Sequence, residues 1–167
     1  MIILSFGSNL KSKFGNKKNT IEFAYSELKN NKVNIIKKSK FYKTISYPNK
    51  ESPKFINSVA YVETLLNERK LLSLLLNIEK KAGRVRSIKN APRTLDIDII
   101  FFNNKIVNIK TNNINLTIPH KNYSKREFVV IPIFEIAPNF RDPKTKIKIL
   151  DLKNKLKQSQ IDSIRKL

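Results

Sequence analysis

The 167-residue chain has 40% hydrophobic and 28% charged residues, the usage of an ordinary globular protein and a length that suits one domain. It contains no cysteine, which excludes disulfides, thiolate nucleophiles and cysteine-ligated metal centres. No apolar run approaches the ~18 residues needed to span a bilayer, and the N-terminus lacks the pattern of a secretory signal. We therefore expect one cytoplasmic domain over residues 1–167 without a membrane segment.

The net charge is strongly positive, with 34 Lys and Arg against 13 Asp and Glu, or +21. Such a charge can indicate binding to a polyanion. Only seven of the 34 cationic residues are Arg, so we interpret most of the charge as a solvated lysine coat. Where Lys is the default cation, an Arg marks a position that needs a planar guanidinium. Four of the seven lie near the motifs described below: Arg84, Arg86, Arg93 and Arg126.

The first half of the chain predicts three strands and one helix. Residues 2–6 form an apolar run closed by Gly7-Ser8-Asn9, which predicts a strand followed by a turn. Helical spacing of apolar residues predicts a helix over about 17–30. Residues 33–45 and 55–64 are rich in β-branched and aromatic residues, which predicts two strands joined by a proline-containing loop at 46–53.

The second half begins with the most regular helical pattern. An apolar stripe that includes Leu71, Leu75 and Ile78 predicts a helix, and Gly83 stands at its expected C-cap. The later segments are a basic stretch, a strand, a hairpin-like region, an apolar helix and a Lys-rich tail: 84–93, 95–102, 105–118, 128–138 and 144–167. The order β-α-β-β-α-β predicts a ferredoxin-like α+β sandwich, with an antiparallel sheet covered by helices on one face.

Two of the five aspartates, Asp96 and Asp98, interrupt the apolar strand at 95–102. Residues i and i+2 of a strand emerge on the same face about 6.6 Å apart, so both carboxylates can converge on a divalent cation. Mg²⁺ commonly joins one or two carboxylates to substrate phosphates. The alternative is a solvated strand face, but unpaired carboxylates within an apolar run would be costly.

The basic stretch before this strand carries Arg84, Arg86 and Arg93. Guanidinium groups bind phosphate in a fork, which together with the aspartates suggests a polyphosphate site. The alternative for each is surface solubility. His120, the only histidine, follows Pro119 in a loop and could donate to a phosphate or act as a general acid, although a lone histidine is more often structural.

A flat heterocycle could be bound by Asn57, through its amide, and by Phe55 and Phe128, through stacking. Ordinary core aromatics and a structural amide are equally compatible with these residues. With three glycines in the chain, neither a Walker-type loop nor a dinucleotide fingerprint is available.

Several segments together resemble the 6-hydroxymethyl-7,8-dihydropterin pyrophosphokinase family of folate biosynthesis, over residues 2–140. The most specific segment is Pro92-Arg93-Thr94-Leu95-Asp96-Ile97-Asp98. The others are Phe6-Gly7-Ser8-Asn9-Leu10, Phe41-Tyr42-Lys43-Thr44, Phe55-Ile56-Asn57-Ser58-Val59, Ile78-Glu79, Gly83-Arg84-Val85-Arg86, Pro119-His120 and Phe134-Glu135-Ile136-Ala137-Pro138. The resemblance implies a ferredoxin-like core, ATP and the pterin as substrates, and two Mg²⁺ ions. It also implies transfer of the β,γ-pyrophosphoryl group of ATP to the pterin hydroxymethyl oxygen, with release of AMP.

The resemblance also implies roles for individual residues. Asp96 and Asp98 would hold both metal ions. The pterin would be bound by Asn57, by backbone groups around Thr44 and Tyr47, and by the rings of Phe55 and Phe128. The residues implied for ATP are Glu79, Arg84, Arg86, Arg93, His120 and Arg126, of which Arg84, Arg93 and His120 would be catalytic. Asn90 and Ala91 stand where the family usually has Trp and Gly.

Two other functions compete with this one. A basic nucleic-acid-binding module on a ferredoxin-like sheet would bind in a strongly salt-dependent way, independently of Asp96 and Asp98. A degenerate kinase-like scaffold would bind ATP without turnover. We expect an active enzyme that acts as a monomer and requires no nucleic acid.

Overall fold

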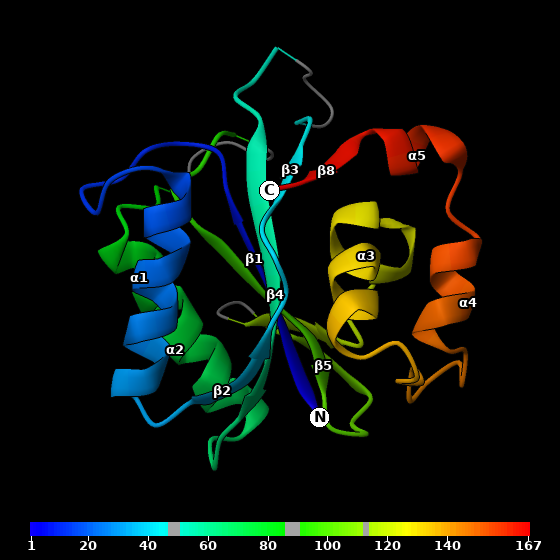
Figure 1. Cartoon of the computed structure of the whole chain (residues 1–167). Helices are drawn as coiled ribbons and strands as arrows, with labels where there is room; N and C mark the ends of the chain where they lie inside the picture. Colours follow the sequence, from blue (N-terminus) through cyan, green and yellow to red (C-terminus); the bar gives the residue numbers. More distant parts are fainter. Residues whose placement is uncertain (47–50, 86–90, 112–113) are drawn as a thin grey trace.

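The computed structural model describes residues 1–46, 51–85, 91–111 and 114–167. Its main sheet has six strands, all paired antiparallel, in the order β5-β1-β4-β3-β8, and β2 also pairs with β4 (Figure 1). The strands are β1 (Ile2–Ser8), β2 (Asn34–Lys38), β3 (Tyr42–Thr44), β4 (Phe55–Glu63), β5 (Asp96–Phe102) and β8 (Ile164–Lys166). The predicted α+β class with an antiparallel sheet is confirmed.

One face of the sheet is covered by α1 (Lys17–Asn30) and α2 (Glu68–Lys81). Both helices begin at an asparagine whose side chain accepts a backbone hydrogen bond: Asn16 from Asn19 N, and Asn67 from Lys70 N. The apolar stripes of the two helices pack on Leu4 and other inward residues of β1, β4 and β5. The bounds of α1 agree closely with the predicted range of about 17–30, and α2 ends just before Gly83, as predicted.

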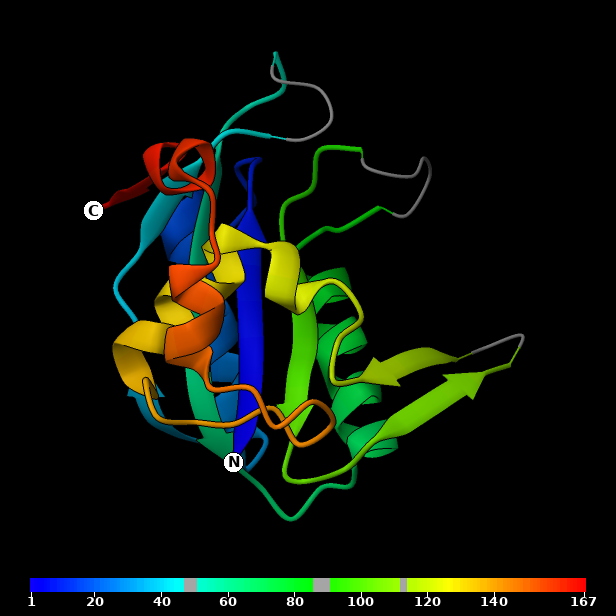
Figure 2. The ribbon, with the colours of Figure 1, turned by 90° about the vertical axis from the view of Figure 1, so that its right-hand side faces the viewer.

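The opposite face is covered by α3 (Glu127–Ile136) and α4 (Ile149–Asn154). Figure 1 shows these two helices on the other side of the sheet from α1 and α2, and Figure 2 shows them in front of it. Ile133 and Leu152 pack there against sheet residues such as Ile3 and Val59. The prediction of helices on one face was therefore wrong, because the second layer comes from the apolar 128–138 segment and from a tail with little periodicity.

Two other segments differ from the sequence prediction. The strand expected over 33–45 is divided into β2 and β3, because at Ser39 the hydroxyl rather than the backbone carbonyl accepts the hydrogen bond from Val59 N. The Lys-rich tail folds into α4, α5 (Gln158–Asp162) and β8.

The hairpin expected near 105–118 is present as β6 (Val107–Lys110) and β7 (Asn115–Ile118), and it projects from the body of the molecule in Figure 2. A short 3₁₀ turn, η1 (Tyr123–Lys125), precedes α3. Within the described residues, every helix is too short or too polar to span a lipid bilayer.

Candidate active site

The candidate site lies on the face of the sheet that α3 covers. Side chains alternate along a strand, so residues two apart share a face. On each of three strands, an apolar residue of this face has a polar residue two positions away, toward the same end of the sheet. The pairs are Ile3 and Ser5, Val59 and Asn57, and Ile100 and Asp98. The face therefore changes from core to polar site on three neighbouring strands, with Ser5 opposite Asp98 and Asn57 one level further along, opposite Gly7.

Gly7 is at the centre of this polar region. It lies opposite Asn57 of β4 and opposite Asp96 of β5. A Cβ atom at this position would come within 3.2 Å of Asn57 Oδ1. Asn57 is buried, and its Nδ2 donates to the hydroxyl of Thr44 at 2.8 Å. Gly7 thus leaves open space between the candidate heterocycle-binding amide and the candidate metal-binding carboxylate.

The structure brings three arginines to the two aspartates. Arg84 Nη1 lies 2.5 Å from Asp96 Oδ1, and Arg93 Nη1 lies 3.7 Å from Asp96 Oδ2. On the other side, Arg126 Nη1 lies 3.7 Å from Asp98 Oδ2. Two of the guanidinium groups come from the basic stretch at 84–93 and the third comes from the turn before α3, so all three lie beside the same pair of carboxylates.

The surroundings of Asp98 oppose its ionisation. Burial, together with the negative charge of Asp96, raises the pKa of Asp98 to about 7, although Arg126 opposes the shift. Two ionised carboxylates at this spacing therefore repel each other even with arginines nearby. Among the described residues, no group of three or more His, Cys, Asp or Glu side chains could hold a metal.

Glu79 reaches the site through Arg84. It is 2% exposed, and its Oε1 accepts from Arg84 Nη1 at 2.5 Å and from Ile97 N at 2.8 Å. Arg84 is placed by the end of α2, where Gly83 has a φ of 81° and Arg84 N donates to Glu79 O. The carboxylate therefore links α2, the arginine and the start of β5.

Arg93 is held by Asn9, a residue that the sequence indicated only as part of a turn. Arg93 N donates to Asn9 Oδ1 at 2.6 Å, and Asn9 N and Leu10 N donate to Arg93 O. The guanidinium lies 5.5 Å from the centre of the Phe55 ring. Its buried Nε has no hydrogen-bond partner among the described residues, nor has the buried hydroxyl of Thr94. In the sequence, the Gly7-Ser8-Asn9 motif was the feature that pointed to a special role for Asn9, although not to its contact with Arg93.

His120 lies beside β5, where its backbone N donates to Ile100 O at 3.0 Å. Its Nδ1 accepts from Asn122 N at 3.3 Å, which places the proton of the neutral ring on Nε2. Burial, followed by the charges of Arg126 and Lys121, lowers the pKa of His120 to about 4. The imidazole is therefore neutral near pH 7, and hydrogen-bond donation suits it better than general-acid catalysis.

Phe128 lies in the first turn of α3, and the guanidinium of Arg126 is 5.7 Å from its ring centre. The two candidate stacking rings, Phe55 and Phe128, are thus each next to an arginine of the site. Three residues singled out in the sequence, Tyr47, Arg86 and Asn90, lie outside the described residues.

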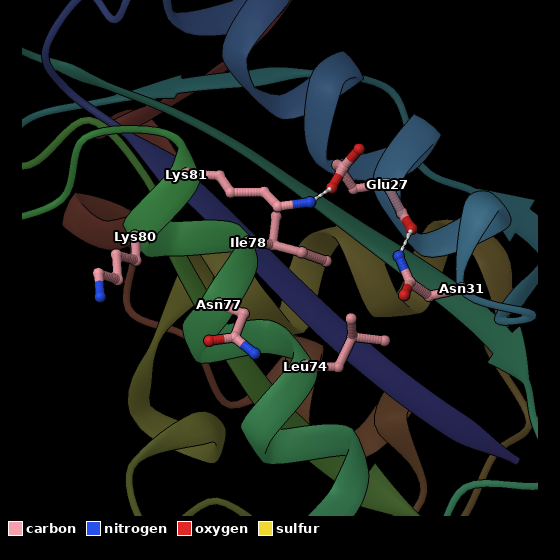
Figure 3. Close-up of a pocket in the computed structure, with 7 residues that line it drawn as sticks. All are labelled: Glu27, Asn31, Leu74, Asn77, Ile78, Lys80 and Lys81. Carbon is pink, nitrogen blue, oxygen red and sulfur yellow. Dashed lines mark hydrogen bonds and ion pairs between the residues drawn. The ribbon is translucent and has the colours of Figure 1, made fainter.

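A separate pocket of about 420 Å³ lies between α1 and α2 (Figure 3). None of the residues predicted for the site lines it. Its polar groups contact one another: Lys81 Nζ lies 2.6 Å from Glu27 Oε2, and Asn31 Nδ2 donates to Glu27 O at 2.8 Å. The pocket is therefore not part of the candidate site.

Comparison with known proteins identifies the family. The model of the 7,8-dihydro-6-hydroxymethylpterin-pyrophosphokinase (HPPK) family matches residues 3–138. A 2-amino-4-hydroxy-6-hydroxymethyldihydropteridine pyrophosphokinase of Haemophilus influenzae is 38% identical over 144 residues, which cover 86% of each chain. The folic acid synthesis protein fol1 of Pneumocystis carinii is 32% identical over 98% of this chain, which spans only 21% of that longer protein.

The fold is shared with solved structures. The wild-type HPPK-DHPS of Plasmodium falciparum superposes with a TM-score of 0.73 at 18% identity, over 92% of this chain and 44% of that one. An HPPK-DHPS in complex with substrates gives a TM-score of 0.75 at 17% identity, over 99% of this chain and 46% of that one. The resemblance seen in the sequence motifs is thereby confirmed: the chain belongs to the 6-hydroxymethyl-7,8-dihydropterin pyrophosphokinase family and is a pyrophosphokinase of folate biosynthesis.

Proposed function

We propose that this chain transfers the β,γ-pyrophosphoryl group of ATP to the hydroxymethyl oxygen of 6-hydroxymethyl-7,8-dihydropterin at the site around Gly7. A bond forms between that oxygen and the β-phosphorus, the bond from the β-phosphorus to the α,β-bridging oxygen breaks, and the hydroxyl proton is lost, leaving AMP. The observation that supports this assignment is the placement of Gly7 between Asn57 and Asp96. An amide for the heterocycle and a carboxylate for metal-bound phosphate then lie on the same sheet face, one on each side of Gly7.

Asp96 and Asp98 fit Mg²⁺, and we assign two ions to them. A pair of carboxylates is the protein contribution that Mg²⁺ usually takes when substrate phosphates supply further oxygens. Burial and the negative charge of Asp96 both raise the pKa of Asp98, and a bound cation would offset the repulsion between the two carboxylates. When bound, Mg²⁺ neutralises phosphate oxygens and helps to orient the reacting groups.

The triphosphate is assigned to Arg84, Arg93 and Arg126, together with Arg86 and His120. Arg93 has a buried Nε donor without a partner among the described residues, and a phosphate oxygen would satisfy it. Arg84 remains oriented through Glu79 even when its contact with Asp96 is exchanged for phosphate. His120 donates from Nε2, since Nδ1 already accepts from Asn122 N.

The pterin is assigned to Asn57, the backbone around Thr44 and Tyr47, and the rings of Phe55 and Phe128. Thr44 fixes the orientation of the Asn57 amide, because Nδ2 donates to its hydroxyl. The amide Oδ1 then lies on the Gly7 side, where it can accept from an N–H of the heterocycle. We further propose that residues 1–167 act as a monomeric single domain.

Product analysis tests the assignment. The protein is incubated with Mg-ATP, with and without the pterin, and AMP is resolved from ADP. We expect pterin-dependent AMP from the wild type and a fall of at least about a hundredfold for Asp96→Asn and Asp98→Asn. Asp151→Asn, which changes an exposed carboxylate in α4, is the matched control. Formation of ADP, or full activity in both site variants, contradicts the proposed mechanism.

A further inference from the structure

The C-terminal segment, residues 158–167, lies outside the 3–138 region that the family model matches. It nevertheless returns to the main sheet as β8, which pairs antiparallel with β3 along the outer edge (Figure 1). In this register Ile164 lies opposite Thr44 and Arg165 lies opposite Lys43. Thr44 is the residue whose hydroxyl orients Asn57, so the segment is one strand away from the proposed pterin-binding amide.

β3 depends on its neighbours because it is only three residues long. On its inner side it pairs with β4, where Thr44 lies opposite Phe55 and Tyr42 opposite Asn57. On its outer side β8 satisfies backbone groups that an edge strand would leave unpaired. The pairing continues beyond the strand, since Leu167 N donates to Phe41 O at 2.9 Å.

A carboxylate of α3 reinforces this arrangement. Glu135 accepts from Lys40 N and from the Tyr42 hydroxyl, each at 2.9 Å, and lies 3.3 Å from Lys166 Nζ. Glu135 therefore ties β8 and the start of β3 to the same helix. The position of β3 is fixed from three sides: by β4, by β8 and by α3.

The same C-terminal segment also contacts the turn that leads into α3. Gln160 Nε2 donates to Lys125 O at 3.0 Å and to Glu127 Oε2 at 3.3 Å. The Ser163 hydroxyl, which donates to Gln160 O at 2.7 Å, also lies 3.4 Å from Glu127 Oε1. Lys125 and Glu127 flank Arg126, and Phe128 follows. Segment 158–167 thus contacts both the strand that carries Thr44 and the turn that carries Phe128.

We propose that residues 158–167 are a positioning segment for the pterin, which set the distance and orientation between the Thr44–Asn57 pair and the Phe128 ring. The inference rests on the proposed assignment of these residues to the pterin. None of the segment's residues touches the substrate in this role. The segment acts by holding two separately anchored parts of the pterin site in one geometry, which reduces the ordering cost of binding.

Arg165→Pro, with Arg165→Ala as the matched control, tests the proposal. Hydrogen-bonded pairs alternate along an antiparallel ladder, so the bond from Leu167 N to Phe41 O makes Lys43 and Arg165 the next such pair. Proline at position 165 removes the backbone N–H that donates in this pair. Alanine keeps that N–H and removes only the exposed arginine side chain. We expect the KM for the pterin to rise about tenfold in Arg165→Pro, and to stay unchanged in Arg165→Ala. The KM for ATP should change less than about twofold in either variant.

A second variant keeps the test decisive if Arg165→Pro does not fold. The double variant Gln160→Ala/Ser163→Ala retains the β8 backbone and removes the side-chain contacts with Lys125 and Glu127, together with two local side-chain bonds of α5. It should raise the KM for the pterin alone. The positioning role is overturned if the KM for the pterin is unchanged in every folded variant. It is also overturned if the variants lose kcat while the KM values for the pterin and for ATP both stay unchanged. Asn57→Ala, measured in parallel, separates the two proposals: if that variant also binds pterin normally, the assignment of the pterin site is wrong.

Discussion

Gly7 lies directly opposite Asn57 in the antiparallel register of β1 and β4, and a Cβ atom on Gly7 would lie 3.2 Å from Asn57 Oδ1. Contacts of this length are tighter than ordinary van der Waals contact. The next nearest atoms would be in the ring of Phe55, at 3.6 Å and 3.8 Å. The glycine is therefore required for space beside the two proposed pterin contacts.

Gly7→Ala should weaken pterin binding more than it weakens the fold. The added methyl must displace the Asn57 amide or the Phe55 ring, and overpacking of this kind costs about 1–3 kcal/mol. We expect the KM for the pterin to rise by about tenfold, with the KM for ATP nearly unchanged. Steady-state kinetics with each substrate varied in turn checks this. An equal rise in the KM for the pterin and in the KM for ATP would mean that the methyl group disturbs the site as a whole rather than the pterin contacts alone.

Arg84→Lys should reduce activity although it keeps the charge. The Arg84 guanidinium, whose side chain is 10% exposed, contacts Glu79 and Asp96 simultaneously. Both contacts are made by the same atom, Nη1, whereas a lysine ammonium offers a single nitrogen that cannot keep both contacts and also donate in a fork to phosphate. Loss of one charge-assisted hydrogen bond predicts a fall in kcat/KM of about ten- to a hundredfold. Arg141→Lys, at an exposed arginine that donates to Lys146 O, should retain wild-type kinetics.

Glu79→Gln should act on ATP use rather than on the pterin. The amide oxygen of Gln can still accept from Ile97 N, but the negative charge that orients Arg84 is lost. We expect kcat/KM for ATP to fall about tenfold while the KM for the pterin stays constant. Glu68→Gln, which changes a carboxylate paired with Lys105 at 2.6 Å, is the control. If the two variants behave alike, Glu79 has no positioning role.

The parts of the site that the sequence predicted are those with a local pattern. Alternation within 95–102 placed Asp96 and Asp98 on one face, and β5 spans Asp96–Phe102 with its intervening Ile97 and Ile99 buried. The scarcity of arginine pointed to Arg84 and Arg93, and both contact Asp96.

The remaining contacts arise from tertiary structure. Asn9 reads as a turn residue, and its bond to Arg93 N joins positions 84 residues apart. Glu79 occupies an ordinary helical position, and its burial is visible only once β5 packs beside α2. The tail that forms β8 has almost no periodic signal, because its order comes from pairing with β3 rather than from its own amphipathicity.

The buried contact between Tyr123 and Asp142 predicts a pH-dependent contribution to stability. Tyr123 donates its hydroxyl to Asp142 Oδ2 at 2.5 Å, beneath the turn that leads to α3. Burial opposes ionisation of Asp142, but hydrogen bonds from the Tyr123 hydroxyl and from the N–H groups of Lys144 and Thr145 outweigh it and lower the pKa of this carboxyl. Ionised Asp142 therefore stabilises the fold above its unfolded pKa of about 3.9, and this contribution is lost as the pH falls through the lower folded value.

Asp142→Asn should accordingly lower the free energy of unfolding by about 1–3 kcal/mol at pH 7. The difference from the wild type should shrink as the pH falls from about 4 toward 2, because the wild-type carboxyl then becomes neutral as well. Urea denaturation at a series of pH values measures both quantities, and Asp151→Asn, at an exposed carboxylate, should change little at any of them. A difference that stays constant down to pH 2 would show that Asp142 acts through packing and neutral hydrogen bonds, since only an ionised carboxylate loses its contribution on protonation.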